Sequence, residues 1–159
     1  MKKNVALIAC GCFALGLVVG AVGTHIVTTC IAGKRAADAM AIEQFVRVGE
    51  ASERAGAAYR HESKPVAIYA QSQLVIELNK AAGNEGYVST LPEGIVPFDT
   101  MLAHARLAKL YGETQQAERS TQQVAQALEC AKRARNCSAV TNWAALVKLV
   151  ERIDRNARD

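Results

Sequence analysis

The chain has 159 residues, of which 50% are hydrophobic and only 5% aromatic, and its 19 basic and 15 acidic residues give a net charge of +4. Lys2 and Lys3 are two of those basic residues, so the part from Lys34 onward is nearly balanced in charge. This balance argues against nucleic acid or anionic lipid as the main partner. Many alanines and only three prolines predict an all-α fold.

The first 33 residues form the most apolar part of the chain. No charged residue lies between Val5 and Gly33, and a stretch of about 20 apolar residues is enough to span a bilayer. We therefore expect a single transmembrane signal anchor over 1–33. A cleavable signal peptide is the alternative, because Ala21-Val22-Gly23 is an acceptable cleavage site, and it would release a secreted or periplasmic helical protein.

Small residues recur every four positions within this apolar stretch. The predicted helix-packing positions are Cys12, Gly16, Gly20 and Thr24, of which the two glycines form a GxxxG motif. Small residues allow two helix backbones to approach closely in lipid, which predicts a homodimer or a partner helix in the membrane. The alternative is that these glycines have no packing role, since glycine is common in membrane spans.

The orientation of the anchor depends on the charges that flank it. Lys2 and Lys3 precede the span, and Lys34 and Arg35 follow it. The number of basic residues is therefore equal on the two sides, so the positive-inside rule gives almost no preference. A short Lys-Lys leader nevertheless favours a cytoplasmic N-terminus. That orientation predicts a single-pass protein of the bacterial inner membrane with its helical domain in the periplasm.

A linker helix is predicted over 34–62. Its apolar residues follow one face at a spacing near 3.6, and we expect that face to point inward. The expected inward residues are Ile42, Phe45, Val46, Gly49, Ser52 and Tyr59.

A small antiparallel helical-hairpin domain is predicted over 63–159, which gives about five helices after the anchor. Its first helix begins at Ser63-Lys64-Pro65 and ends at Gly83-Asn84. An apolar loop follows at 84–98, and we expect Tyr87, Ile95 and Phe98 to contact a partner from it. A purely structural lid is the alternative.

Three further helices are predicted in the C-terminal half. Asp99 is expected to cap a helix that runs to about Thr114, and a second helix is expected over 117–135. Ser138 is expected to cap the last helix. Leu107, Tyr111 and Trp143 are expected to form the packed frame.

Residues 104–131 resemble one tetratricopeptide repeat. The matching positions are Leu107, Ala108, Tyr111, Ser120, Val124, Ala127 and Leu128. Trp143, Leu146 and Val150 resemble the start of a second unit. The sequence departs from the repeat at His104, where an aromatic residue is usual, at Gln115, where glycine is usual, and in lacking the terminal proline. The resemblance implies an adaptor that holds a peptide or protein segment.

No catalytic or metal-binding motif stands out, so we expect a non-catalytic protein with no cofactor and no metal; the alternative is an enzyme whose site has no recognised motif. His104 is expected to be a hydrogen-bonded core residue. Cys130 and Cys137 are separated by six residues, which excludes a CxxC pair. Two alternatives remain for them, a disulfide between two helices or two buried thiols. The leading hypothesis is a membrane-anchored helical adaptor or scaffold, which binds a protein partner or is a subunit of a membrane complex.

Overall fold

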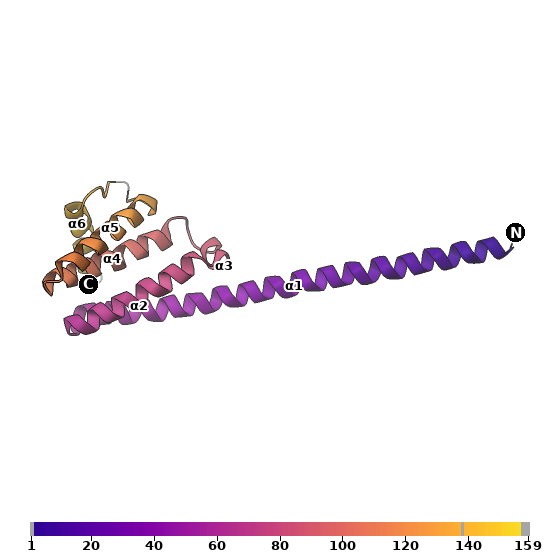
Figure 1. Ribbon diagram of the computed structural model, residues 1–159, viewed down its shortest axis with the longest axis horizontal. Helices are drawn as coiled ribbons and strands as arrows, with labels where there is room; N and C mark the ends of the chain where they lie inside the picture. The colour runs from indigo at the N-terminus through magenta and orange to yellow at the C-terminus, as the bar shows by residue number, and fades with distance from the viewer. Residues whose placement is uncertain (1, 138, 157–159) are drawn as a thin grey trace. The chain divides into compact units, whose positions relative to one another are not determined.

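The structure is a computed structural model that describes residues 2–137 and 139–156, with side chains from Thr28 onward. The described residues contain helices and no strand, which confirms the all-α prediction (Figure 1). The six helices are α1 (Lys2–His61), α2 (Lys64–Ala82), α3 (Glu85–Ser89), α4 (Ile95–Glu113), α5 (Ala117–Arg133) and α6 (Trp143–Asn156). The chain divides into two compact units, 1–39 and 40–159.

The predicted anchor falls largely on residues whose side chains are not described. Cys12, Gly16, Gly20 and Thr24 all lie outside the described side chains, so their packing role remains a prediction. Among the residues that were described, no helix combines the length and apolar character needed to cross a membrane.

The second unit begins inside α1, at Met40, so 40–62, which is most of the segment expected to form a linker, belongs to the second unit. The buried positions among the described residues of α1 are spaced by three, four or seven residues and are mostly alanine. They are Ala41, Val48, Ala51, Ala55 and Ala58. Three of them, Val48, Ala51 and Ala55, form a hydrophobic cluster with Leu74, Leu78 and Ala81 of α2.

The predicted inward face of α1 is therefore wrong. Ile42 is 64% exposed, Val46 is 55% exposed, and Phe45 is 39% exposed. The alanine stripe is buried in their place because small side chains allow α1 and α2 to approach closely. The larger apolar residues Ile42, Phe45 and Val46 lie on the neighbouring face of α1 and are exposed to solvent.

Two glutamines set the antiparallel register of α1 and α2. Gln44 Nε2 donates a hydrogen bond to the carbonyl oxygen of Glu77 at 3.2 Å. Gln71 Nε2, from the opposite helix, donates to the carbonyl oxygen of Ala55 at 3.1 Å. Because of these two bonds, the part of α1 near Gln44 lies beside the C-terminal end of α2 near Glu77.

The segment expected to be one long loop, 84–98, is mostly helical. Asn84 Oδ1 accepts a hydrogen bond from the Tyr87 amide at 3.0 Å and caps α3. Gly94, with φ 80°, precedes α4, so Asp99 lies inside that helix and is not its N-cap. Pro97 is compatible with this earlier start, because the first turn of a helix has amides without intrahelical acceptors.

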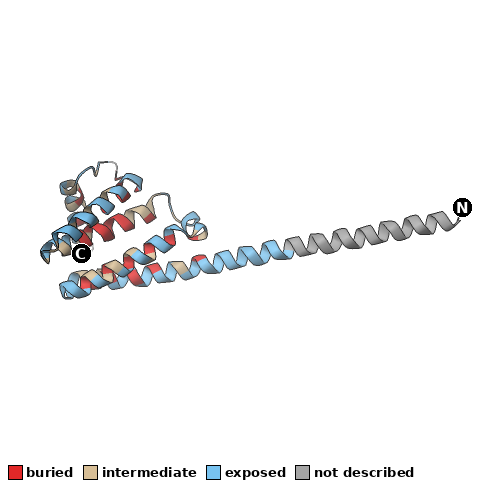
Figure 2. Ribbon diagram, in the orientation of Figure 1, coloured by how far each residue is buried: buried red, intermediate tan, exposed pale blue. Residues whose placement is uncertain are grey.

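Helix α4 is buried along most of its length and takes part in two hydrophobic clusters (Figure 2). Val96 and Ala103 belong to the cluster formed with α1, α2 and α3. Met101, Leu102 and Ala105 belong to the cluster formed with α5 and α6. Every other element of the second unit thus packs around α4.

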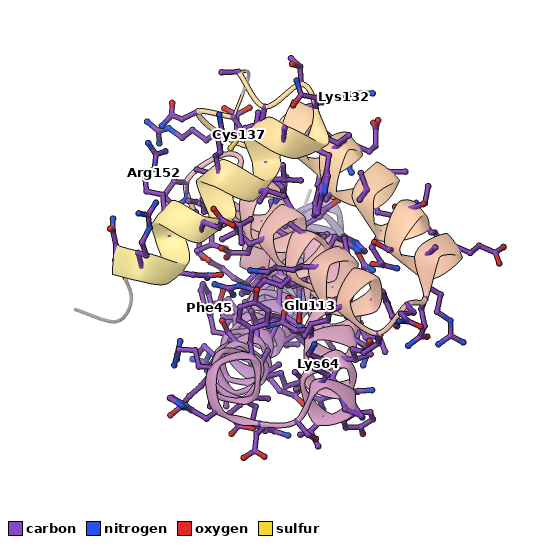
Figure 3. The ribbon with its side chains drawn as sticks, turned by 90° about the vertical axis from the view of Figure 1, so that its left-hand side faces the viewer. Phe45, Lys64, Glu113, Lys132, Cys137 and Arg152 are labelled. Atoms are coloured by element: carbon purple, nitrogen blue, oxygen red, sulfur yellow. The ribbon has the colours of Figure 1, made fainter. Side chains whose placement is uncertain are left out.

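Polar contacts attach α2 and α6 to α4. Lys64 at the start of α2 pairs with Glu113 at the end of α4 at 3.2 Å (Figure 3). Arg106 of α4 donates to Asp154 Oδ1 of α6 from Nε at 3.2 Å and from Nη2 at 2.5 Å. Asn142 caps α6, because its Oδ1 accepts from the Ala145 amide at 2.9 Å. Ser138, the predicted cap, lies outside the described residues.

Candidate protein-binding groove

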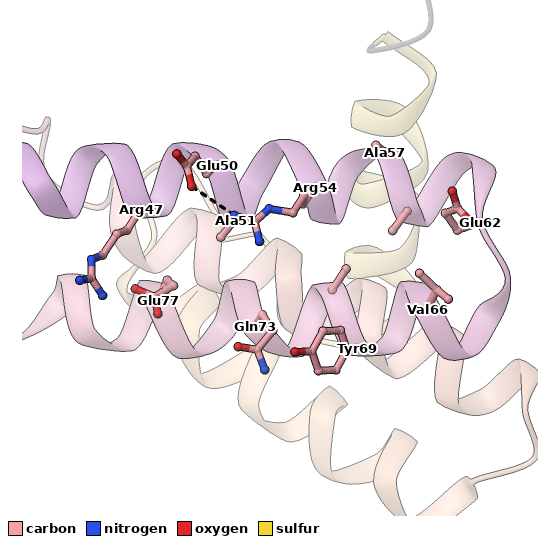
Figure 4. Close-up of a pocket in the computed structure, with 12 residues that line it drawn as sticks. Arg47, Glu50, Ala51, Arg54, Ala57, Glu62, Val66, Tyr69, Gln73 and Glu77 are labelled. Carbon is pink, nitrogen blue, oxygen red and sulfur yellow. Dashed lines mark hydrogen bonds and ion pairs between the residues drawn. The ribbon is translucent and has the colours of Figure 1, made fainter.

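An open groove of about 620 Å³ runs between α1 and α2 (Figure 4). Both walls belong to the second unit, so the register of the two helices fixes the shape of the groove. The lining residues are Arg47, Glu50, Ala51, Arg54, Ala57, Ala58, Glu62, Val66, Tyr69, Ala70, Gln73 and Glu77.

The groove combines small residues with exposed apolar side chains. Ala57 and Ala58 from α1 and Ala70 from α2 leave room for another polypeptide to approach. Tyr69 is 67% exposed and Val66 is 47% exposed. Tyrosine is enriched at the centres of protein interfaces, where its ring is buried against a partner.

Charged residues along the groove are paired mostly within their own helix. Arg47 bonds to Glu43 at 2.6 Å, and this bond raises the pKa of the Arg47 guanidinium. Arg54 pairs with Glu50 at 3.2 Å. Exposed pairs of this kind contribute little to stability, so they can exchange partners when another surface arrives.

Glu77 is a charged residue of the groove whose carboxylate is partly buried. Its Oε1 accepts from Lys80 at 2.7 Å, and its side chain is 16% exposed. Its Oε2 is buried and has no hydrogen-bond partner. A buried carboxylate oxygen without a donor is costly, and the burial of this one within the chain keeps it out of reach of a side chain from another molecule.

The three residues predicted to contact a partner lie elsewhere and do not share one cluster. Tyr87 is buried beside α1, where its ring lies 4.5 Å from the ring of Phe45 at an interplanar angle of 53°. This burial raises the pKa of Tyr87. Ile95 is half-buried, and the half-buried Phe98 packs against the α4–α6 cluster.

The predicted frame residues are buried to different degrees. Leu107 is buried, as expected. Tyr111 and Trp143 are half-buried. Trp143 packs against the α4–α6 cluster. The guanidinium of Arg119 lies 5.8 Å from the Tyr111 ring centroid.

His104 lines a second, smaller cavity of about 360 Å³, together with Cys130 and Arg133. Its Nδ1 lies 2.6 Å from Gln123 Oε1. Because an amide oxygen only accepts, Nδ1 carries the proton of this bond. Burial lowers the pKa of His104, which keeps the ring neutral. These contacts agree with the expected hydrogen-bonded core histidine.

Cys130 and Cys137 are free thiols, and both are buried in the cluster of α4, α5 and α6. Burial raises the pKa of each thiol, which disfavours the reactive thiolate. The structure thus has the second of the two alternatives, buried thiols that act as small apolar side chains.

The described residues contain no group of three His, Cys, Asp or Glu side chains suited to a metal ion. No known protein family matches the chain, and neither curated proteins nor solved structures give a match.

The groove was missed at the sequence level, although part of its signal was present. Ala51, Ala55 and Ala58 repeat at the spacing of a buried helical face, but larger residues one position away obscured them. The groove also depends on which residues of α1 lie opposite which residues of α2. Gln44 and Gln71 set that register by bonding to backbone carbonyl oxygens. Every residue has a backbone carbonyl, so these partners could not be recognised from the sequence.

Proposed function

We propose that this chain is a non-catalytic, membrane-anchored helical scaffold that binds protein through the groove between α1 and α2. Its N-terminal 33 residues would hold it in the membrane, and its helical unit would present the groove in the aqueous compartment. The periplasmic side of a bacterial inner membrane is the location that the Lys2-Lys3 leader favours.

The groove is the observation that carries this proposal. Val66 and Tyr69 expose apolar surface on a floor of alanines, and charges of both signs border them. Exposed apolar surface with a polar border is typical of protein interaction sites. The uncharged stretch from Val5 to Gly33 supports the membrane part of the proposal.

The resemblance of residues 104–131 to a tetratricopeptide repeat agrees with a binding role. Helices α4 and α5 form an antiparallel pair, and Ser120 Oγ donates to the Ala108 carbonyl at 2.8 Å. Gln115, which stands where the repeat usually has glycine, adopts φ 59°. That left-handed conformation is the one that glycine adopts most readily.

Membrane extraction and mass spectrometry test the anchored state. We expect the full chain to stay in the membrane pellet after an alkaline carbonate wash, with residues 1–33 still attached. Recovery of a soluble chain that begins near Thr24 would instead support the second candidate, a helical protein released after cleavage at Ala21-Val22-Gly23.

A substitution in the groove tests the binding role. Ala57 is exposed on the groove wall, so Ala57→Arg is expected to leave the fold intact and to obstruct the groove. Protein that co-purifies with the full chain in mild detergent should be lost in this variant. Gln122→Arg, on the exposed side of α5, is the matched control. Equal recovery of bound protein from both variants would contradict the proposal.

A further inference from the structure

The two walls of the groove carry complementary side chains at two levels along its length. The hydrogen bonds from Gln44 and Gln71 fix the register, and the levels can be followed in Figure 4. Arg47 stands approximately level with Glu77, and Arg54 with Tyr69, while Ala57 and Glu62 of α1 both stand near the level of Val66. Two of these levels thus pair complementary groups, opposite charges at Arg47 and Glu77 and a cation with an aromatic ring at Arg54 and Tyr69.

We propose that the groove is filled by a second copy of this chain, so that two α1–α2 hairpins form a four-helix bundle. This proposal rests on the proposed function, in which the groove binds protein, and it identifies that protein as a second copy of the chain. The two-fold axis would run parallel to α1 and α2. Such an axis keeps each residue at its own level and sets α1 of one copy beside α2 of the other, antiparallel to it.

This arrangement turns the pairs within one groove into pairs between two copies. Arg47 of one copy meets Glu77 of the other, and Arg54 lies against the exposed ring of Tyr69, where a cation–π contact forms. Ala57 meets Val66, so apolar surface is covered at the same time. Because the axis is two-fold, every contact occurs twice.

A two-fold axis running across the helices does not give the same complementarity. It would reverse the levels and place Glu77 of one copy against Val66 of the other. It would also separate Arg47 of each copy from Glu77 of the other, so these opposite charges would no longer meet.

Glu77 provides a second reason for a second copy. Its side chain is 16% exposed at the groove, and Lys80 bonds to its Oε1 at 2.7 Å. A guanidinium from the other copy would meet the exposed edge of this carboxylate, and arginine is well suited to a carboxylate at an interface. Arg47 is free to do so because its bond to Glu43 is exposed.

A charge exchange between two versions of the full chain tests the proposal in mild detergent. Arg47→Glu and Glu77→Arg each place two like-charge pairs in a homodimer, so each variant alone should dimerise roughly tenfold or more weakly than the original. An equal mixture of the two variants should recover dimerisation, because both pairs in the heterodimer are again opposite in charge. Sedimentation and co-purification of differently tagged copies measure this. Glu151→Arg, an exposed charge reversal on α6, is the control.

A crosslink locates the interface even if the predicted anchor also holds copies together. One tagged copy carries Ala57→Cys and another carries Val66→Cys, both with Cys10, Cys12 and Cys30 replaced by serine. A short bis-maleimide should join the two tagged copies. A dimer that never gives this crosslink, or an original chain that is monomeric, would overturn the proposal. A crosslink from Ala57→Cys to a different protein would show that the occupant is not a second copy, and the proposed function would still stand. No crosslink to any protein would contradict both the second copy as occupant and the proposed function.

Discussion

Gly94 joins α3 to α4 in a conformation that glycine adopts without strain. Its φ is 80°, and an added Cβ would lie 2.6 Å from the backbone nitrogen of Arg135. Gly94→Ala should therefore lower the free energy of unfolding by about 2–4 kcal/mol. Gly49→Ala is the matched control, since nothing lies within 4 Å of its added Cβ, and it should raise stability by about 0.5–1 kcal/mol. Chemical unfolding that gives the two variants the same sign of change would contradict this assignment.

His104 should make stability depend on pH. Burial holds its folded pKa below the ordinary value of 6.5, so its neutral form is favoured in the folded state. The corresponding stability is present above pH 6.5 and is lost as the pH falls through the folded pKa. The free energy of unfolding should therefore fall between pH 7.5 and pH 5 because of this residue.

Two histidine variants isolate that contribution. His104→Gln keeps a donor for Gln123 without titrating, so its stability should fall less over this pH range than that of the original chain. His61→Gln changes an exposed histidine and should follow the original chain. If His104→Gln shows the same loss as His61→Gln, His104 does not titrate as described.

At the scale of elements, an ion pair adds to the apolar contacts that hold α6 against α4. Arg106 and Asp154 are 17% and 16% exposed, and the Arg106 guanidinium also lies 5.4 Å from the Tyr59 ring centroid. Asp154→Ala would leave that guanidinium partly buried without its carboxylate. The free energy of unfolding should fall by about 1–3 kcal/mol. Glu151→Ala, an exposed neighbour on α6, should change it by less than about 0.5 kcal/mol in the same unfolding experiment.

The helices themselves were largely predictable from the sequence, because their start and stop signals are local. Ser63-Lys64-Pro65 and Gly83 bound α2 as expected. The start of α4 was harder to predict, because 84–98 contains more than one possible N-cap. Asp99 is the stronger capping residue by type, but α4 begins after Gly94. The inward face of α1 depends on how closely α2 approaches, which is a tertiary property.

The candidate site was less predictable than the helices. Tyr87, Ile95 and Phe98 were expected to contact a partner because they are apolar residues in an apparent loop, yet Tyr87 is part of the core. The groove lies instead between two helices, and its residues are ordinary surface types one by one. Only the register of α1 against α2 brings Arg47 level with Glu77 and Ala57 level with Val66.

At the scale of the whole molecule, the proposed function requires two parts, a membrane anchor and a protein-binding groove. Both parts can be tested together by placing a photo-crosslinking amino acid at Ala57 in the full chain in its native membrane, with Gln122 as the control position. We predict a crosslinked protein adduct from Ala57, found in the carbonate-washed membrane fraction, and none from Gln122. An Ala57 chain that forms no adduct, or that forms one only in the soluble fraction, would contradict the account.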